Sequence, residues 1–415
     1  MANPKLRFKA ADGTEYPEWG STTLNKQGVF IRGLSYKKQN VVDDHTKTLV
    51  LRSSNILQFG KLDYLNKCQF VNKQPLPNQI LQKGDIVICM ANGSAHLVGK
   101  ASCYEGGYQT GNLTVGAFCS IYRQHTFPIA KYIFQTQSYL NFISENSQGG
   151  NGAISNIKPS TYEDFECSYP CLEEQRKIAD FLSTFDDKVE AKEQQLEALQ
   201  ETKKGLLQQI FSQQLRFKAD DGTEFPDWRK TSIAKIAKVI GGGTPSTKNP
   251  EYWDGDVLWF TPSEINSKYL STSQKCITDL GVKKSSAKVL PKNTLLLTTR
   301  ASLGLCSINN LDQLVSTNQG FQSLVCNECV NHEFLYYCIS TKSFQNEMLR
   351  LSSGSTFKEI SSTALKSINV CVPCFEEQRK IAEFLGAFDE KIEAVKRQLE
   401  ALREIKKGLL QQMFV

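Results

Sequence analysis

Residues that could perform catalysis do not form a familiar arrangement in this sequence of 415 residues. It contains no G-x-x-x-x-G-K-[ST] phosphate-binding loop, no G-x-S-x-G nucleophile elbow and no H-E-x-x-H metal-binding helix. Its four histidines show no pairing that would suggest a general base or a metal site: His45, His96, His125 and His332. We therefore expect no catalytic residue in this chain.

One short motif tests this expectation. The run Asn249-Pro250-Glu251-Tyr252 is similar to the N-P-P-Y box of adenine methyltransferases, but it departs from that box at the third residue. No glycine-rich loop that could bind S-adenosylmethionine follows a strand elsewhere in the chain. We expect no cofactor to bind to this chain.

Thirteen cysteines raise the question of a disulfide framework or a zinc site. A long chain without an export signal is expected to keep its thiols reduced. Two C-x-x-C pairs, Cys326 with Cys329 and Cys371 with Cys374, could together supply the four ligands of structural zinc. The other half of the chain has Arg123 to Thr126 in place of the first pair, so buried thiols are the simpler interpretation and no metal ligand is assigned.

Several turn-rich segments carry the groups that bind nucleic acid. The stretch from Gly241 to Trp253 combines backbone amides, hydroxyls, a lysine and aromatic rings. Clustered cations elsewhere can contact phosphates, and amide or guanidinium side chains can read base edges. The predicted contact residues are Arg32, Lys37, Lys38, Arg52, Asn55, Asn92, Thr244, Ser246, Lys248, Tyr252, Lys283, Lys284, Lys288 and Arg300.

The charge distribution supports a polyanionic partner. The formal net charge is +6, and residues 20–170 and 229–373 are each net positive, whereas the rest of the chain is net negative. Such an excess is typical of regions that contact DNA. No apolar run approaches the roughly 18 residues of a membrane span, and the N-terminal stretch lacks the apolar core of a signal peptide. We expect a cytoplasmic protein with no membrane partner.

Two long repeated segments must position these residues. Residues 171–211 and 374–414 are identical at 29 of 41 aligned positions, and apolar residues follow an alternating four-three spacing in both. This heptad pattern predicts two helices that pair within the chain, with lysines interrupting the seam at 192, 203 and 406. The main seam residues are Ile178, Leu182, Phe185, Val189, Leu196, Leu199, Leu206 and Ile210, and Ile381, Leu385, Phe388, Ile392, Val395, Leu399, Leu402, Leu409 and Met413.

A second repeat accompanies the helices. Residues 6–19 and 215–228 match at 11 of 14 positions, and both contain an Asp-Gly turn followed by Pro and Trp. The second copy directly follows the first helix, whereas no copy follows the second helix. We infer that the N-terminal copy occupies that place, so that the two ends of the chain meet in a pseudo-twofold ring.

The two regions between the repeats are predicted to share a mixed α and β fold. Residues 51–56 and 260–265 echo each other with an offset of 209, as do residues 81–88 and 290–297. Glycine-rich loops at 147–154 and 353–360 precede a short strand, a proline and the long helix in both halves.

The whole chain resembles the specificity subunits of type I restriction and modification enzymes. The resemblance rests on the two-module layout and on the E-E-Q-R-K-I-A-x-F-L helix openings at Glu173 and Glu376. It rests also on the K-K-G-L-L-Q-Q helix ends at Lys203 and Lys406, and on the G-G-T-P-S-x-x-N-P-x-Y-W box that ends at Trp253. The first module lacks this box and has residues 28–33, Gly-Val-Phe-Ile-Arg-Gly, in that region.

The resemblance implies an α+β protein with two pseudo-twofold-related target recognition domains, separated by two long antiparallel helices that form a coiled coil. Each domain would read one half of a bipartite site in double-stranded DNA. The helices, about 40 residues and roughly 60 Å long, would set the spacing of the half-sites. The expected boundaries are 1–19 for the N-terminal turn motif, 20–170 for the first recognition domain, 171–211 for the first helix, 212–228 for the repeated motif, 229–373 for the second recognition domain and 374–415 for the second helix.

The resemblance also implies partners. In the family the specificity subunit is not catalytic: two modification subunits bind it, supply S-adenosylmethionine and methylate adenine, and restriction subunits add cleavage. The polar helix faces and the repeated turn motifs are the expected docking surface. Two alternatives stay open, a DNA methyltransferase or nuclease with a divergent active site and a non-catalytic coiled-coil adaptor. The target bases and the spacer length do not follow from the sequence.

Overall fold

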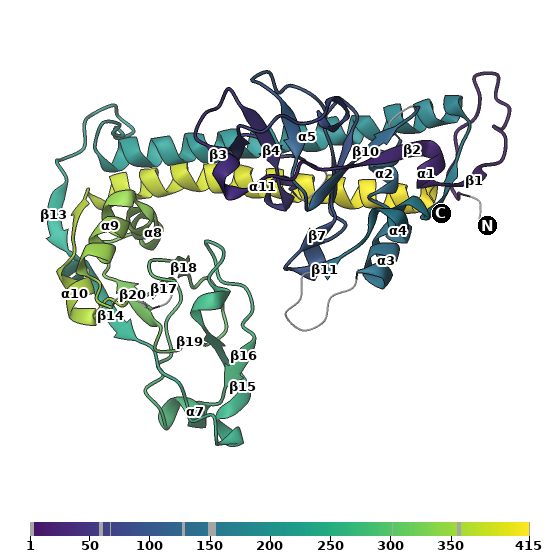
Figure 1. The fold of residues 1–415 in the computed structure, drawn as a ribbon. Coiled ribbons are helices and arrows are strands. Elements are labelled where there is room, and N and C mark those ends of the chain that lie inside the picture. Colours follow the sequence, from purple (N-terminus) through teal and green to yellow (C-terminus); the bar gives the residue numbers. More distant parts are fainter. Residues whose placement is uncertain are drawn as a thin grey trace. The chain divides into compact units, whose positions relative to one another are not determined.

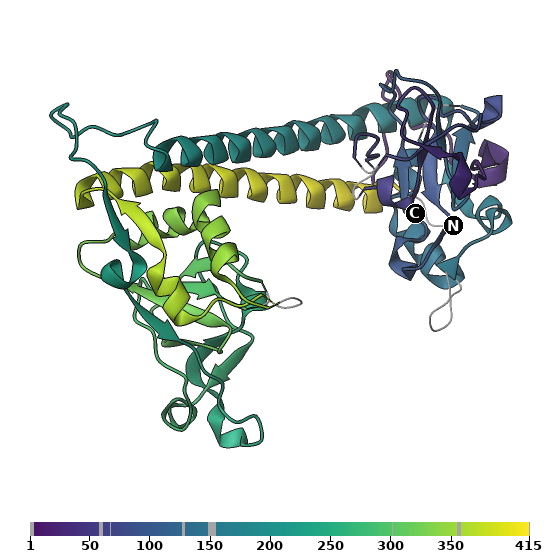
Figure 2. The same ribbon diagram turned by 60° about the vertical axis from the view of Figure 1, so that its left-hand side comes forward.

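The computed structural model describes residues 4–57, 61–66, 68–126, 129–147, 155–300, 302–354 and 358–414. The chain forms two compact units, which we call unit 1 (Met1–Glu193 and Arg397–Val415) and unit 2 (Gln194–Lys396). Each unit therefore contains one part of each long helix, α5 (Leu172–Phe211) and α11 (Phe375–Met413). The predicted combination of mixed α and β modules with two long helices is confirmed (Figures 1 and 2).

The two helices pair in an antiparallel manner within each unit. In unit 1, Asp186 contacts Lys406 and Glu193 contacts Arg403, so the numbering rises along α5 while it falls along α11. In unit 2, Lys203 of α5 forms an ion pair with Asp389 of α11. Predicted seam residues are buried on both helices: Ile178, Leu182, Val189, Leu399 and Met413 in unit 1, and Ile210, Ile381, Leu385, Ile392 and Val395 in unit 2.

The module of unit 1 consists of short strands in several sheets. A two-stranded antiparallel sheet joins its first and last strands, and two four-stranded sheets form its centre in the orders β2-β10-β6-β8 and β3-β5-β4-β9. β4 and β9 are parallel. The strands are β1 (Gly20–Thr23), β2 (Gly28–Arg32), β3 (Val41–Val42), β4 (Thr48–Leu51), β5 (Phe70–Val71), β6 (Ile86–Cys89), β7 (Ala91–Asn92), β8 (Ala101–Cys103), β9 (Leu113–Val115), β10 (Cys119–Gln124), β11 (Ser155–Asn156) and β12 (Glu166–Tyr169).

The module of unit 2 repeats this topology, which confirms the inference that the two regions share a fold. Its sheets have the orders β13-β21, β14-β20-β17-β18 and β16-β15-β19, and β15 and β19 are parallel, as β4 and β9 are. The strands are β13 (Arg229–Ser232), β14 (Ala237–Gly241), β15 (Trp253–Phe260), β16 (Lys275–Ile277), β17 (Leu295–Thr298), β18 (Cys306–Ile308), β19 (Val315–Thr317), β20 (Phe321–Cys326) and β21 (Asn369–Val372).

Short helices complete both modules. In unit 1 they are α1 (Leu24–Gln27), α2 (Ala130–Ile133), α3 (Gln137–Asn146) and α4 (Pro159–Glu163). In unit 2 they are α6 (Ile233–Ile236), α7 (Asp279–Lys283), α8 (His332–Ser340), α9 (Lys342–Leu351) and α10 (Ser362–Ser367). Most of the loop at 147–154 and the centre of the loop at 353–360, which the sequence singled out, lie outside the described residues.

The long helices share a hydrophobic core with each module. In unit 1, Ile178 of α5 and Leu410 of α11 belong to the same buried cluster as Tyr122 of β10. In unit 2, Ile381 of α11 belongs to the same cluster as Phe334 of α8. Burial of such side chains is the dominant favourable contribution to folding, so each module is fixed to its helix segments by apolar packing.

The repeated turn motif closes each unit through a buried carboxylate. In unit 1, Arg7 donates hydrogen bonds of 3.1 and 2.9 Å to Glu174, and Trp19 Nε1 donates one of 3.0 Å to the same carboxylate, which is fully buried. The hydrogen bond to Glu174 raises the pKa of Arg7. The Leu6 N–H also donates to the carbonyl oxygen of Gln412 at 3.0 Å, which confirms that the two ends of the chain meet.

Unit 2 repeats these contacts. Arg216 donates hydrogen bonds of 3.2 and 2.8 Å to Glu377, and Trp228 Nε1 donates one of 3.1 Å. The L-R-F-K motif and the E-E-Q-R-K helix opening are therefore repeated together because each copy of one supplies the partner of the other.

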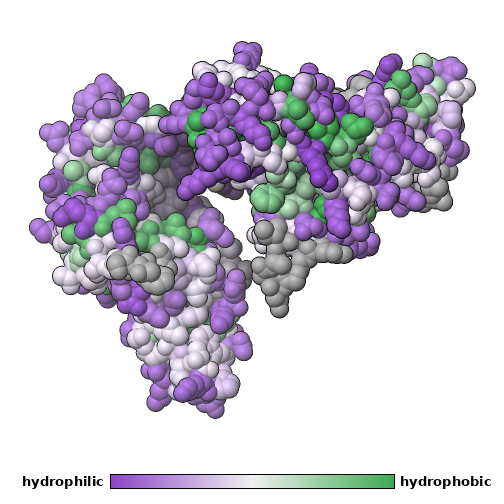
Figure 3. All heavy atoms as spheres, in the orientation of Figure 1, coloured by the Kyte–Doolittle hydropathy of each residue, from purple (hydrophilic) through white to green (hydrophobic). Residues whose placement is uncertain are grey.

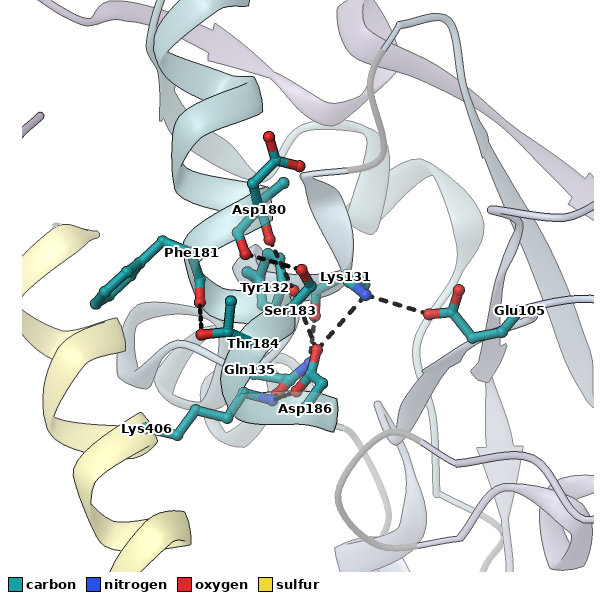
Figure 4. Close-up of polar contacts among 11 residues, drawn as sticks. Glu105, Lys131, Tyr132, Gln135, Asp180, Phe181, Ser183, Thr184, Asp186 and Lys406 are labelled. Carbon is teal, nitrogen blue, oxygen red and sulfur yellow. Dashed lines mark hydrogen bonds and ion pairs between the residues drawn. The ribbon is translucent and has the colours of Figure 1, made fainter. Parts of the chain in front are cut away.

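The lysines that interrupt the predicted seam have specific partners. Lys406 Nζ lies 2.6 Å from Asp186 Oδ1, and the hydroxyl of Tyr132, on α2, donates to Asp186 Oδ2 at 3.0 Å (Figure 4). In unit 2, Asp389 forms an ion pair with Lys203 and accepts a 2.5 Å hydrogen bond from Tyr337 of α8. Each of these junctions joins both long helices to a module, so the polar seam positions fix the module on the helix pair.

Two surface properties bear on function. Figure 3 shows a mainly hydrophilic surface on both units, with hydrophobic side chains scattered over it. Among the described residues, no helix combines the length and the apolar character that crossing a membrane would require.

Candidate nucleic-acid interface

Four loops of unit 1 meet around the turn between β9 and β10. In this turn the Cys119 N–H donates to the Gly116 carbonyl at 2.8 Å, which places Ala117 and Phe118 at its two corners. The carbonyl of Phe118 accepts a 2.8 Å hydrogen bond from the N–H of Met90, and the Gly116 N–H donates to the carbonyl of Leu51 at 2.8 Å. The loops that follow β4 and β6 are thereby held against the turn.

The segment after β2 approaches the same turn very closely. The Gly33 N–H donates to the Cys119 carbonyl at 3.2 Å and the Leu34 N–H to the Val115 carbonyl at 2.7 Å. A Cβ atom on Gly33 would lie 2.1 Å from the Gly116 carbonyl oxygen, so only glycine fits here. We call the four loops, residues 33–38, 52–55, 90–96 and 116–118, the loop end of unit 1.

Unit 2 repeats this arrangement hydrogen bond by hydrogen bond. Gly243 N–H donates to the Thr317 carbonyl at 2.8 Å, and Thr299 N–H donates to the Gly320 carbonyl at 2.8 Å. A Cβ atom on Gly242 would lie 1.9 Å from the Asn318 carbonyl oxygen. The loop end of unit 2 consists of residues 242–248, 261–264, 299–300, 302–304 and 318–320.

This equivalence corrects the placement of the glycine-rich box. The offset of 209 pairs Gly242 with Gly33, so the counterpart of the box in unit 1 starts at Gly33, the last residue of the run 28–33, directly after β2. Four predicted cations lie on or beside this segment and the next loop, and all are exposed: Arg32, Lys37, Lys38 and Arg52.

Asn55 does not fit the predicted contact with a base edge. Its side chain is 1% exposed; Oδ1 accepts from the N–H of Arg52 at 2.9 Å, and Nδ2 donates to the Asp63 carbonyl at 2.8 Å. Glu264 occupies the equivalent place in unit 2, where it accepts from the N–H of Thr261 at 2.7 Å. Both residues cap a short 3-10 helix, Ser53–Asn55 or Pro262–Glu264, so the prediction for Asn55 is wrong.

The side-chain amide of Asn92 also forms hydrogen bonds within the protein. Its Nδ2 donates to Ser53 Oγ at 2.8 Å, and its Oδ1 accepts from the N–H of Ser94 at 2.9 Å. Asn92 is half-buried and links two of the loops. Its role at the loop end is to hold the loop that carries Arg52.

The predicted residues of unit 2 fall into two groups. Thr244, Ser246 and Lys248 lie on the loop end, where the carbonyl of Ser246 accepts a 3.1 Å hydrogen bond from Trp253 Nε1. Lys283, Lys284 and Lys288 are exposed at the end of α7 and just beyond it, and Tyr252 is half-buried beside that helix. The close approach of Gly243 to Ala287, where a Cβ atom would lie 2.3 Å from the backbone nitrogen, brings this second group next to the first.

Arg300 has an acidic partner that reduces its availability to DNA. Its guanidinium forms a 2.6 Å ion pair with Glu359, and the two side chains are 48% and 45% exposed. Arg300 would exchange this ion pair for a contact with DNA, so its role at a base edge stays a prediction. Exposed ion pairs contribute little stability.

Sequence reasoning missed three side chains at the loop ends. Lys73 Nζ donates to the Ser35 carbonyl at 2.7 Å, which adds a cation to the loop end of unit 1. Phe118 is 62% exposed, and Gln319 is exposed at the equivalent turn of unit 2. No local sequence signal identified the last two, because their exposure depends on the turn that the tertiary structure forms.

Burial disfavours the ionised form of several thiol and hydroxyl groups in the two modules. Burial raises the pKa of Cys89 to about 11 and also raises the pKa of Tyr36. Burial likewise raises the pKa of Cys326, in the first C-x-x-C pair, to about 12. Within the described ranges, no group of three or more His, Cys, Asp or Glu side chains is arranged to hold a metal ion.

Comparisons with known proteins identify the family to which both halves of the chain are similar. Residues 5–201 and 226–404 each match the family described as type I restriction modification DNA specificity domain. The chain is 39% identical over 209 residues to the MjaIX specificity subunit of Methanocaldococcus jannaschii, a match that spans 49% of this chain and 48% of that relative. It is 24% identical to the EcoKI specificity subunit of Escherichia coli, over 90% of this chain and 83% of that one.

A solved structure shows the same fold over the whole length. It is the S subunit of a type I restriction-modification system from M. genitalium, with a TM-score of 0.58, 16% identity, and coverage of 100% of this chain and 99% of that one. Because the family model matches both halves, the chain belongs to the family of type I restriction modification DNA specificity domain proteins.

Proposed function

We propose that this chain is the specificity subunit of a type I restriction-modification complex, in which each module reads one half of a bipartite site in double-stranded DNA. The observation that carries the proposal is the duplicated loop end. The same backbone hydrogen bonds hold both sets of loops, whereas the side chains that they present differ. A shared scaffold with different exposed side chains suits two half-sites of different sequence.

The chain itself is proposed to be non-catalytic and to bind no cofactor. S-adenosylmethionine would be bound by modification subunits, two for each specificity subunit, and restriction subunits would add cleavage. The repeated surfaces support two identical partners, because a surface that occurs twice offers two equivalent sites. This complex would work on DNA in the cytoplasm.

The residues that remain for docking are those repeated side chains that the fold does not use. Arg7 and Arg216 turn inward onto buried carboxylates, so the arginines of the turn motifs are not available to a partner. Glu197 with Glu400 and Lys204 with Lys407 are exposed, identical pairs on the long helices. We assign docking of the modification subunits to these helix faces.

The experiment that tests the proposal is selection of duplexes from a random library by the chain reconstituted with its modification subunits. The expected result is a bipartite motif of two short half-sites with a fixed spacer. Affinity for any duplex should fall as salt rises, because cations on the loop ends displace counterions from phosphates. Salt-sensitive binding with no sequence preference would favour the adaptor alternative. Binding of S-adenosylmethionine by the isolated chain in calorimetry would favour the enzyme alternative.

A further inference from the structure

The turn at the centre of each loop end presents different chemistry in the two units. The backbone of the turn is the same, since the carbonyl of Phe118 accepts from Met90 and the carbonyl of Gly320 accepts from Thr299, both at 2.8 Å. The corner residues are Ala117 and Phe118 in unit 1 and Gln319 and Gly320 in unit 2. The two loop ends therefore present different side chains on the same backbone turn.

The ring of Phe118 is exposed, so packing in the hydrophobic core does not explain why an aromatic residue occupies this position. Its ring is left in solvent at 62% exposure while its carbonyl is fixed by hydrogen bonds from Met90 and Ala91. Exposed cations, Arg52, Lys37 and Lys38 among them, lie on the neighbouring loops. An exposed aromatic side chain on a backbone turn fixed by hydrogen bonds, with cations on the neighbouring loops, suits an apolar contact with a DNA base whose phosphates those cations bind.

Gln319 is held in a defined orientation. Its Oε1 accepts a 2.5 Å hydrogen bond from Thr244 Oγ1, and Thr244 belongs to the glycine-rich loop whose backbone is bonded to β19. A carbonyl oxygen can accept a second hydrogen bond. A glutamine amide fixed in this way can accept from N6 and donate to N7 of adenine in the major groove.

We propose that these turns are specificity determinants: Phe118 contacts the C5 methyl group of a thymine in the half-site of unit 1, and Gln319 pairs with an adenine in the half-site of unit 2. The inference rests on the proposed function, because it assigns one base in each half-site that function requires. Thr244 acts as a positioning residue for Gln319. Apolar contact with the thymine methyl group and amide pairing with adenine are chemically distinct, so the two assignments can be tested separately.

The test begins with the motif that the wild-type complex selects from a random duplex library. Phe118→Ala should relax the preference for thymine at one position of the first half-site by roughly 4-fold, the effect of one buried carbon. Gln319→Ala, which removes a bidentate pair, should relax the preference for adenine at one position of the second half-site by roughly 10-fold. In each variant the other half-site is an internal control. Leu140→Ala, which truncates a 51% exposed leucine on α3, should leave both half-sites unchanged.

Base analogues identify the atoms that are read. Replacing the assigned thymine with deoxyuridine removes the methyl group and should weaken wild-type binding roughly 4-fold, the effect expected for one buried carbon. The Phe118→Ala complex should not distinguish the two bases. Replacing the assigned adenine with 7-deazaadenine should weaken wild-type binding but not binding by Gln319→Ala.

Two different results would separate the failure of this inference from the failure of the proposed function. If the wild-type complex selects a bipartite motif but Phe118→Ala and Gln319→Ala keep every base preference, the turns are not determinants, although the proposed function stands. A first half-site that contains no thymine, or a second that contains no adenine, overturns the corresponding assignment. If the wild-type complex selects no motif, the proposed function itself fails.

Discussion

Replacing Glu377 with alanine is expected to lower the free energy of unfolding of unit 2 by about 3 kcal/mol, the low end of the range for removing one partner of a buried ion pair. The carboxylate is fully buried, whereas the side chain of Arg216 keeps 20% of its surface exposed. Its removal leaves the indole N–H of Trp228 without its acceptor, and the guanidinium of Arg216 keeps only the carbonyls of Phe225 and Pro226 and the exposed Asp227. The loss should appear as a lower urea midpoint in tryptophan fluorescence, since Trp228, Trp253 and Trp259 all belong to unit 2.

The neighbouring residue provides a matched control. Glu376 precedes Glu377 on α11 and is exposed. Its counterpart in unit 1, Glu173, accepts a hydrogen bond from Tyr16, but unit 2 has Phe225, which has no hydroxyl group, in place of Tyr16. Glu376→Ala should change stability by no more than about 0.5 kcal/mol. Equal effects of the two substitutions would contradict the role given to the buried carboxylate.

Lengthening both long helices should retarget the protein to sites with a longer spacer. The change inserts four residues between Glu193 and Gln194 of α5 and four between Lys396 and Arg397 of α11, the points at which the two helices pass from one unit to the other. Four helical residues add about 6 Å, close to two base pairs at about 3.4 Å each. Affinity for the original site should fall by roughly 100-fold or more, because only one half-site can then be engaged.

The readout is the motif selected by the wild-type and lengthened proteins, each in complex with the modification subunits. The half-site sequences should be unchanged and only their separation should increase. A changed half-site with an unchanged spacer would contradict the proposal that the helices set the distance. Insertion of four residues into the exposed turn around Asp221 and Gly222 is the control and should leave the spacer unchanged.

The repeats made much of this fold predictable from the sequence. Heptad spacing identified the two long helices, since buried residues such as Leu182 and Leu385 recur at coiled-coil intervals. The position of the turn motif predicted that the two ends of the chain meet, and the hydrogen bond from Leu6 to Gln412 is the contact that the structure shows there. The offset of 209 residues related equivalent loops in the two halves of the chain.

Side-chain partners distant in sequence were not predictable in the same way. The lysines at 203 and 406 were recognised as breaks in the seam, but their partners Asp389 and Asp186 lie on the opposite helix. Arg300 forms an ion pair with Glu359, 59 residues away, which its residue type did not indicate. Asn55 was different, because its alignment with Glu264 three residues after Thr261 already carried the signature of a capping box.

The exposed turn residues show a further limit of sequence reading. Phe118 lies between two buried strands, β9 and β10, and was not among the predicted contact residues. Only the 2.8 Å hydrogen bond from Cys119 to Gly116 shows that it occupies the corner of a turn. Exposure at such a point depends on the tertiary arrangement of four loops, which local sequence does not encode.

The most direct test of the central claim is an exchange of residues 229–373 for the corresponding module of a specificity subunit whose bipartite target is known. Duplex selection, or sequencing of methylated adenines in cells that also contain the modification subunits, gives the motif before and after the exchange. The account predicts that one half-site becomes that of the donor while the other half-site and the spacer stay the same. A change in both half-sites, or in neither, would contradict independent reading by the two modules.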